Sequence, residues 1–487
     1  MSEPVIQTTQ VEAQAAGQIG PTLEPKTARS LSWKPALLWV AGAAAAFHLA
    51  YASPMLCWLM AGYFFCLVQL ARMKTGRQAF YFGLAVGVLT VAPQLTCFWV
   101  IFGPAAIALW LVLAFWIALF VSIARLCLLN FPRASLLLIP LVWTGLEYSR
   151  SELYYLRFSW LNVGYAFSGS SVQGVLLWIG MYGTGFLLAA VATASLVSRT
   201  KVALGIGAGF LIGGIAFDLI LGICTHAESS VAAANKIEVA GTQLEFPAPD
   251  EVVPALDKLV EVYPQAQLLA LSEYTFDDVI PTKVKDWCRR HERYLVVGGK
   301  DPAPKSNFYD TAFVVGPNGD IIFRQVKSDP IQFFKDGLPA TEQRLWESPW
   351  GKIGICVCYD LSYTRVTDHL IRMGAQALVV PTMDVIDWGL LQHELHARVA
   401  PIRAAEYGIP IFRMASSGIS QLTDSVGRVV AKADAPGQHR MIHGFMAIQN
   451  PGSVPPDRWL APFSTCATVV LVVVLCVRMR QAGGRTE

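Results

Sequence analysis

Residues 354–360 read Gly-Ile-Cys-Val-Cys-Tyr-Asp, and they place a cysteine at the end of a strand. An apolar run of β type from Lys352 to Val357 stops at Cys358. The residues from Asp360 to Met373 are typical of the start of a helix. A strand fixes such a thiol, the turn exposes it, and a helix N-terminus favours the thiolate. The pattern predicts a nucleophile within an α/β domain.

Two other interpretations of these cysteines stay open at this point. Buried free cysteines often serve as small hydrophobes, and Cys356, on the same strand face, fits that role better than Cys358. A C-x-C pair could also supply half of a metal site, but no second Cys/His cluster at zinc-like spacing follows.

A second group of candidate metal ligands lies on a predicted helix. His393, Glu394 and His396 place the histidines at i, i+3, whereas the H-E-x-x-H motif needs i, i+4. We interpret them as a helix surface or as the polar wall of a site. The sequence therefore predicts neither a metal nor a cofactor.

The composition is that of a membrane protein. The 487 residues are 54% hydrophobic and 15% charged, against roughly 25% charged residues in soluble domains. A net charge of +3 without a basic block argues against nucleic-acid binding. The ten cysteines are scattered, several of them within apolar runs, which does not resemble a disulfide framework.

Apolar runs dominate the first half of the chain. Residues 1–33 predict a disordered cytoplasmic tail rather than a signal peptide, because no basic-then-apolar pattern begins at Met1. The region 34–223 predicts a seven-span bundle, and 460–478 predicts a final span before a short cytoplasmic tail, 479–487. The eight candidate spans, most near the roughly 20 residues that cross a bilayer, are 35–52, 54–72, 79–102, 104–124, 134–148, 173–198, 202–223 and 460–477.

The basic residues that flank these runs predict the orientation. They fall on one side of the membrane if both termini are cytoplasmic, so the region 224–459 would be exported. The flanking residues are Arg29, Lys34, Arg72, Lys74, Arg77, Arg125, Arg133, Arg199, Lys201, Arg478, Arg480 and Arg485.

The exported region is polar and alternates between strand and helix patterns. It predicts a layered α/β domain, with a hairpin around the turn at 316–319. Predicted strands cover 236–243, 267–271, 294–298, 308–315, 320–326, 352–357, 377–381, 409–414 and parts of 418–433. Predicted helices cover 251–263, 284–293, 360–373 and 392–407.

Two further charged residues follow apolar strands in this domain. A cysteine nucleophile needs a base, and the tetrahedral oxyanion needs a donor. Glu273 follows one apolar run and Lys327 another. Each alone could be a solvated charge at a strand end. Together with Cys358, in the order Glu, Lys, Cys, they indicate a catalytic triad.

Residues 236–445 resemble the nitrilase superfamily of carbon–nitrogen hydrolases. The resemblance rests on the segments 239–243 (VAGTQ), 271–273 (LSE), 326–327 (VK), 354–360 (GICVCYD) and 403–410 (RAAEYGIP). It implies an α-β-β-α sandwich with Glu273 as general base, Lys327 as stabiliser of thiolate and oxyanion, and Cys358 as the acylated nucleophile. The backbone N–H of Tyr359 would be a second oxyanion donor.

Together with the membrane half, the chain resembles apolipoprotein N-acyltransferases from about residue 35 to 478. Residues 143–150 (WTGLEYSR) are similar to that family's W-x-x-x-E-x-x-R stretch, and 158–165 (FSWLNVGY) to its F-P-W-L-x-x-G-Y stretch. The resemblance implies a bacterial inner-membrane enzyme with a phospholipid acyl donor. Cys358 would carry the acyl group as a thioester until the α-amine of a diacylglyceryl-cysteine lipoprotein accepts it.

The loops around the thiol differ from that family's pattern. Counting back from Pro330 puts Gln325 at the usual lysine position, and we assign the role to Lys327, the nearest lysine with the same strand parity. Asp336 would replace the family's second glutamate. Asp360 replaces the glutamate after Cys-Tyr, and Trp388 lies in a changed loop, 383–389. The segment 415–418 (ASSG) replaces the usual Thr-Asn-x-Gly.

Three functions therefore remain candidates. The first is the N-acyltransferase, which includes a divergent form with another amine as acceptor. The second is a membrane-anchored amidase that uses the same triad with water. The third is a binding or sensory protein whose domain is catalytically inert.

Overall fold

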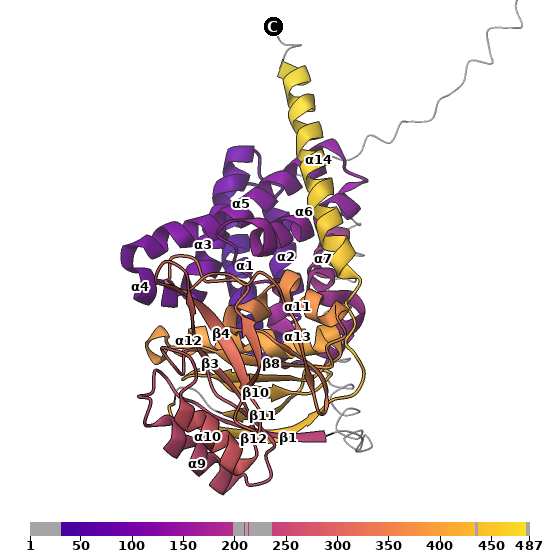
Figure 1. Cartoon of the computed structure of the whole chain (residues 1–487). Helices are drawn as coiled ribbons and strands as arrows, with labels where there is room; N and C mark the ends of the chain where they lie inside the picture. Colours follow the sequence, from indigo (N-terminus) through magenta and orange to yellow (C-terminus); the bar gives the residue numbers. More distant parts are fainter. Residues whose placement is uncertain (1–30, 198–208, 210–212, 214–235, 434–436, 484–487) are drawn as a thin grey trace, which may run out of the picture.

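The computed structural model describes residues 31–197, 209, 213, 236–433 and 437–483 (Figure 1). A helical bundle stands on a sandwich of two six-stranded sheets. The predicted tail up to residue 30 lies outside the described residues, as does the predicted span 202–223 except for residues 209 and 213.

The bundle consists of apolar helices from both ends of the chain. Its helices are α1 (Trp33–Ala52), α2 (Leu59–Leu70), α3 (Gly76–Gln94), α4 (Cys97–Phe102), α5 (Ala106–Asn130), α6 (Ser135–Tyr148), α7 (Leu176–Val197) and α14 (Asp457–Gly483). The C-terminal helix α14 packs against α6 and α7, so the end of the chain returns to the N-terminal half.

Four stretches of helix in the described part of the chain are long and apolar enough to cross a membrane. They are Trp33–Ala52, Cys97–Asn130, Trp178–Leu196 and Asp457–Gln481. The helix Leu59–Leu70 is apolar but shorter. The helices fit membrane insertion, and the total of eight spans remains a prediction.

The predicted span 79–102 is two helices rather than one. Helix α3 ends at Gln94 and α4 begins at Cys97. Pro93, in the last turn of α3, has no N–H to donate and clashes with the preceding turn, which explains the break. Because of this break, α4 lies against the short helix η7 (Ile386–Trp388) of the sandwich domain.

The two sheets have the same internal plan. The first has the order β12-β1-β2-β3-β4-β5, and the second has the order β11-β10-β9-β8-β7-β6. In the first sheet β1, β2 and β3 are parallel, and in the second sheet β7, β8 and β9 are parallel. The other neighbouring pairs in both sheets are antiparallel. The strands of the first sheet are β1 (Lys236–Thr242), β2 (Leu268–Ala270), β3 (Tyr294–Ala303), β4 (Asn307–Val315), β5 (Ile321–Val326) and β12 (Met441–Ala447). Those of the second are β6 (Leu345–Ser348), β7 (Gly351–Ile355), β8 (Ala377–Thr382), β9 (Ile411–Ala415), β10 (Ser420–Thr423) and β11 (Val429–Ala433).

Helices cover the outer face of each sheet. Helices α9 (Val252–Val262) and α10 (Thr282–His291) pack on the first sheet, at the end of the molecule far from the bundle. Helices α11 (Thr364–Arg372), α12 (Leu390–Ala397) and α13 (Val399–Tyr407) lie between the second sheet and the bundle. The layered α/β domain that the strand and helix pattern predicts is confirmed, with the layers α-β-β-α.

The predicted helix 392–407 is divided at Arg398 into α12 and α13. Pro401 is the third residue of α13, and its missing N–H cannot bond back to Ala397, so the first helix ends there. This division turns α12 toward the thiol while α13 runs under the bundle.

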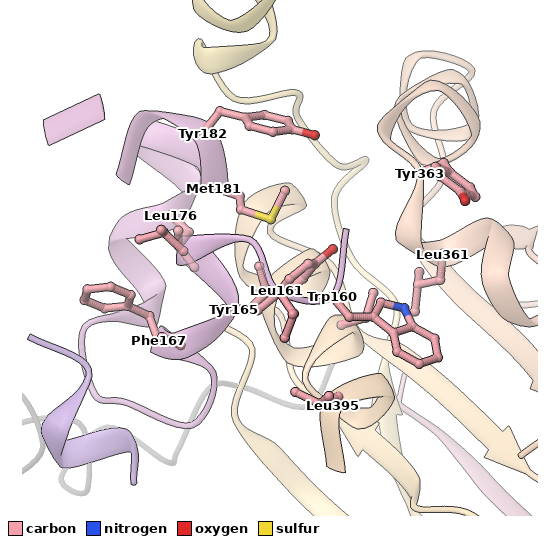
Figure 2. Close-up of a cluster of buried hydrophobic side chains, with 14 of the residues drawn as sticks. Trp160, Leu161, Tyr165, Phe167, Leu176, Met181, Tyr182, Leu361, Tyr363 and Leu395 are labelled. Carbon is pink, nitrogen blue, oxygen red and sulfur yellow. The ribbon is translucent and has the colours of Figure 1, made fainter. Parts of the chain in front are cut away.

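The two halves of the molecule share one hydrophobic core (Figure 2). Buried side chains from the loop after α6 and from α7 pack against side chains of the sandwich domain. The labelled members are Trp160, Leu161, Tyr165, Phe167, Leu176, Met181, Tyr182, Leu361, Tyr363 and Leu395.

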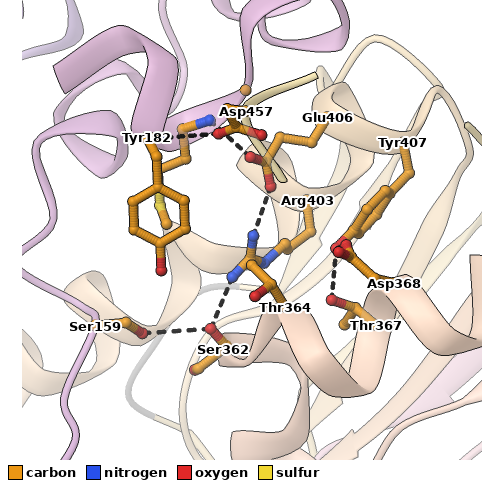
Figure 3. A network of polar contacts seen from close by, with 12 residues as sticks. Ser159, Tyr182, Ser362, Thr364, Thr367, Asp368, Arg403, Glu406, Tyr407 and Asp457 are labelled. Atoms are coloured by element: carbon orange, nitrogen blue, oxygen red, sulfur yellow. Dashed lines mark hydrogen bonds and ion pairs between the residues drawn. The ribbon is translucent and has the colours of Figure 1, made fainter. Parts of the chain in front are cut away.

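A buried ionic network lies at the same junction (Figure 3). Glu406 of α13 accepts from Arg403 at 2.6 Å and from Arg458 of α14 at 3.1 Å. Helix α7 breaks at Gly180, which has φ 71°, and two amides beyond the break donate across the junction. The N–H of Met181 donates to Glu406 at 2.7 Å, and the N–H of Tyr182 donates to Asp457 at 2.8 Å. These carboxylates satisfy helix amides that would otherwise lack partners.

Candidate active site

Cys358 lies just beyond β7, at the first position of the 3-10 helix Cys358–Ser362. Its backbone is left-handed, with φ 50°, a conformation that costs an L-residue on the order of 1–2 kcal/mol. The thiol is 3% exposed and donates to the carbonyl oxygen of Met383 at 3.7 Å. The predicted strand-to-helix turn is confirmed.

Glu273 follows β2, and its buried carboxylate lies near enough to the thiol to raise the pKa of Cys358. Its Oε1 accepts from Lys327 at 2.7 Å, and its Oε2 accepts from the N–H of Met383 at 2.7 Å. Gly298 of β3 allows this approach, because a Cβ there would lie 2.5 Å from the Glu273 Cα. The carboxylate is therefore held between a cation and a backbone amide.

Lys327 follows β5 and is enclosed by carboxylates. Its Nζ lies 2.7 Å from Glu273, 2.8 Å from Asp336 and 3.4 Å from Asp310. Carboxylate oxygens of these three acids come within 4.8 Å of one another, a set that could hold a metal ion. In this structure the ammonium supplies the positive charge among them. The structure thus brings Glu273, Lys327 and Cys358 together.

The site at rest holds a thiol rather than a thiolate. Burial and the neighbouring Glu273 carboxylate raise the pKa of Cys358 well above its usual value, although Lys327 opposes them. The expectation that the helix N-terminus favours the thiolate is wrong for this state, because burial outweighs one short helical turn. A proton must leave the sulfur as it attacks.

The pKa values of two buried carboxyl groups shift in opposite directions. Burial alone would raise the pKa of Glu273, but the Lys327 ammonium and hydrogen bonds lower it below its usual value. Burial and the Glu273 charge raise the pKa of Asp310 well above its usual range. Burial lowers the pKa of Lys327, but the neighbouring carboxylates raise it by more than burial lowers it. The side chain therefore stays cationic. Glu273 is the charged group poised to take the thiol proton.

The supporting residues predicted from the sequence lie around this triad. Asp336 accepts from the Tyr274 hydroxyl at 2.7 Å and from the Ile331 N–H at 2.7 Å while it contacts Lys327. The Asp360 carboxylate binds backbone N–H groups. It accepts from the N–H groups of Ser328 and Asp329 at 2.9 and 2.7 Å, and burial raises its pKa to about 7. It ties the segment after Lys327 to the cysteine turn.

Gln325, the other candidate for the lysine position, points elsewhere. Its side chain donates to the Val326 and Glu342 carbonyls and accepts from the Arg344 N–H. Its amide is thus fully used on a loop beside β5 and is not part of the carboxylate cluster around Lys327.

Tyr359 and Trp388 line the space in front of the thiol. The Tyr359 ring lies 5.7 Å from the ring of Trp160, edge to face, and its hydroxyl donates to the Arg157 carbonyl at 3.5 Å. The Trp388 ring lies 6.3 Å from that of Phe334. Both belong to the wall of an apolar cavity.

This cavity runs from Cys358 to the bundle and has a volume of about 110 Å³. Its far wall consists of apolar side chains of α4 and α5, namely Phe98, Ile101, Phe102, Leu109, Val112 and Leu113. A membrane helix pair thus faces the thiol directly.

Sequence reasoning missed several of these groups. Asp310 lies inside β4, and its signal is a lone carboxylate within an apolar strand. The Met383 backbone and the Asp384 side chain come from the loop after β8, whose approach depends on how the two sheets pack. His393 and His396, predicted to be a helix surface or a polar wall, are buried, and His396 lies in the cavity wall.

Comparison with known proteins agrees with the division of the chain into two halves. Residues 35–194 match the apolipoprotein N-acyltransferase N-terminal domain, and residues 257–440 match the carbon–nitrogen hydrolase domain.

Curated relatives extend the similarity across both halves. An apolipoprotein N-acyltransferase of Shewanella oneidensis is 22% identical over 414 residues, which are 72% of this chain and 77% of the relative. One of Geobacter metallireducens is 22% identical over 339 residues, 60% of this chain and 64% of the relative. Among solved structures, Nit3 of Saccharomyces cerevisiae, a nitrilase-superfamily member, has a TM-score of 0.38 and 18% identity, covering 45% of this chain and 93% of that one. The chain therefore joins an apolipoprotein N-acyltransferase N-terminal domain to a carbon–nitrogen hydrolase domain, and it is similar over most of its length to apolipoprotein N-acyltransferases.

Proposed function

We propose that the protein is an N-acyltransferase that moves a fatty acyl group from a phospholipid to the α-amine of a lipoprotein's N-terminal diacylglyceryl-cysteine. The observation that carries the proposal is the apolar cavity, in which Cys358 faces helices α4 and α5 of the bundle. An acyl chain attached to the sulfur would extend along Val112, Leu113 and Phe98. A small polar amide would gain little from such a wall.

In the first half-reaction, Glu273 takes the thiol proton as the sulfur of Cys358 attacks the ester carbonyl. The Lys327 ammonium stabilises the thiolate and the tetrahedral oxyanion, and the Tyr359 N–H is a second donor. The carbon–oxygen bond breaks, the proton passes to the leaving alkoxide, and lysophospholipid departs. A thioester remains on Cys358.

The apolar helices and the basic residues between them support a location in the bacterial inner membrane. We propose eight spans, with both termini cytoplasmic and the domain 224–459 exported. The bundle would be 34–223, the last span 460–478, and the tails 1–33 and 479–487. The donor would then reach the cavity from the surrounding bilayer.

A membrane-anchored amidase is the second candidate, because the domain 257–440 matches carbon–nitrogen hydrolases. It would use the same triad, with water as the acceptor. The two functions differ in whether the acyl-enzyme persists in water, and this difference can be measured.

Intact-mass spectrometry of the protein in detergent with phospholipid tests the proposal. We expect a fatty-acyl mass increment on the wild type and on Cys356→Ala, and none on Cys358→Ala. Cys356 is the matched control, since it is equally buried and lies two residues away on the strand side of the turn. Addition of a diacylated lipopeptide should remove this mass increment from the protein, and the same increment should then appear on the lipopeptide.

Other outcomes would contradict the acyltransferase. Release of free fatty acid or ammonia without a lasting adduct would favour the hydrolase. An adduct on Cys358→Ala, or no adduct and no product with any lipid or amide, would refute acyl transfer through this thiol.

A further inference from the structure

A second titratable pair lies beside the thiol, outside the Glu-Lys-Cys triad. Asp384, in the loop after β8, is buried, and its Oδ1 accepts from Nδ1 of His396 at 2.7 Å. Its Oδ2 accepts from Arg413 at 2.5 Å, and its Oδ1 also accepts from Gln392 at 3.1 Å. Gly418 leaves room for this carboxylate, since a Cβ there would lie 2.3 Å from Oδ2. The aspartate is therefore fixed from three sides.

This arrangement determines the tautomer of His396. A carboxylate only accepts hydrogen bonds, so the proton of the neutral ring is on Nδ1 and Nε2 carries a lone pair. The ring stacks on Trp160, with centroids 4.5 Å apart and planes at 21°. Both rings belong to the wall of the cavity that contains Cys358.

The Nε2 atom of His396 has no hydrogen-bond partner among the residues that the structure describes. His393, one turn earlier on α12, differs, because its Nε2 bonds to the Val385 carbonyl at 3.0 Å. An oriented imidazole in the cavity wall thus has one ring nitrogen that no described residue uses.

The second half-reaction needs a proton acceptor of this kind. A neutral amine that attacks a thioester becomes positively charged at nitrogen and must lose a proton before the amide is formed. Asp384 holds the imidazole of His396 in one orientation, as the aspartate of a Ser-His-Asp triad holds its histidine.

We propose that His396, oriented by Asp384, is the base that takes the proton from the acceptor amine; this inference rests on the proposed acyl transfer. The amine nitrogen attacks the thioester carbonyl carbon, and a nitrogen–carbon bond forms. The proton on nitrogen passes to His396 Nε2. The carbon–sulfur bond then breaks, Lys327 stabilises the departing thiolate, and the imidazolium returns the proton to the sulfur, so that amide and free thiol result.

The charges around the ring agree with this role. Burial lowers the pKa of His396 and Arg413 lowers it further, while Asp384 and Glu273 raise it, and the net pKa is below the usual 6.5. The ring is neutral at pH 7 and can accept a proton. As the pH falls through that pKa the ring becomes charged and the base is lost, so transfer to the amine should slow on the acid side.

The test separates the two half-reactions on the full-length protein in detergent. The substitution His396→Asn keeps a side-chain donor for Asp384 but removes the unpaired ring nitrogen, Nε2. The acyl-enzyme is formed with phospholipid, a diacylated lipopeptide is added, and loss of the acyl mass is followed over time. We expect acylation within about threefold of the wild type and discharge slower by about 100-fold, the usual scale of general-base catalysis.

The matched control is His393→Gln, which keeps a donor for the Val385 carbonyl on the same helix. Its discharge rate should equal that of the wild type. Equal discharge in His396→Asn and the wild type would overturn the role of His396 and leave the acyltransferase intact. A wild type that never acquires the acyl mass would instead refute the proposed function.

The pH profile gives a readout that a purely structural role would not change. After correction for ionisation of the acceptor amine, with a pKa of roughly 7.7–8.0, wild-type discharge should fall on the acid side as the pH passes the lowered pKa of His396. The same fall should be absent in His396→Asn. If that variant does not acylate, the wild-type profile decides, and a corrected rate without an acid-side fall over the whole pH range in which the protein stays folded overturns the proposal.

Discussion

At the scale of single residues, the chemistry depends on one ammonium among three acids. Lys327 is 1% exposed and lies within 3.4 Å of Glu273, Asp310 and Asp336. A buried ion pair is weak evidence for stability, but removal of one partner leaves uncompensated charge. Lys327 thus sets the charge balance of its neighbours, in addition to the oxyanion role that we propose for it.

The substitution Lys327→Met should abolish acylation of Cys358 and destabilise the protein by about 3–5 kcal/mol, because buried carboxylates lose their cation. Adding Asp310→Asn should recover part of the melting temperature but none of the acylation. Thermal unfolding and intact mass measure the two effects. The control is Gln325→Met, which should still acylate, and acylation that survived Lys327→Met but not Gln325→Met would reverse the assignment.

Glu273, Lys327 and Cys358 could be predicted because each closely follows a strand that the sequence pattern indicates. Their meeting could not, because Glu273 and Lys327 follow β2 and β5 of the first sheet and Cys358 follows β7 of the second, so it depends on how the two sheets pack. Asp310 could not be found this way, since it lies within β4, and the partner of His396 depends on a loop contact between distant segments. The spacing along α12 allowed His396 to be interpreted as part of the polar wall of a site. It gave no information on which other elements pack against that helix.

At the scale of elements, helix α13 connects the catalytic domain to the bundle through Glu406. This residue accepts from Arg403, from Arg458 of α14 and from the Met181 N–H beyond the break in α7. Three helices from distant parts of the chain therefore meet at one carboxylate (Figure 3).

We expect Glu406→Gln to lower the melting temperature by several degrees, because two buried arginines lose their shared anion. Its matched control is Asp286→Asn, which removes the exposed pair with Arg289 and should change stability by less than about 1 kcal/mol. Thermal unfolding in detergent compares the two. Equal melting temperatures would show that the network does not hold the halves together.

The elements of the sandwich domain followed from strand alternation and turn residues, but two predicted helices were too long. Both contain a proline, Pro93 or Pro401, at the position that explains the break. The pattern of apolar residues continues across each break, so periodicity alone joins the segments. The two breaks allow α4 to contact η7 and α12 to face the thiol. These contacts depend on tertiary packing, which the sequence pattern does not show.

At the scale of the whole molecule, the cavity belongs to neither half alone. Its far wall is α4 and α5, and its near wall carries Cys358 and His396. The sequence predicted a bundle and a catalytic domain in the right order. It did not predict which bundle helices face the thiol, because the two apolar faces of α5 look alike in composition.

Filling the far wall should shorten the acyl chains that the protein accepts. In Val112→Trp, each methylene that no longer fits should reduce the preference for long chains by about fourfold, since a buried methylene contributes about 0.8 kcal/mol. Competition between phospholipids with long and short chains, with the adduct read by intact mass, measures the change. The control Leu111→Trp lies on the same helix, is 45% exposed and is not part of the cavity, so its chain preference should match the wild type.

The left-handed backbone at Cys358 bears on the third candidate, a domain that only binds. A glycine would adopt φ 50° without strain, so at this position the fold itself favours a residue with no side chain. The cysteine therefore adds backbone strain that a glycine would avoid, and strain of this kind is found at active sites more often than in domains that only pack or bind.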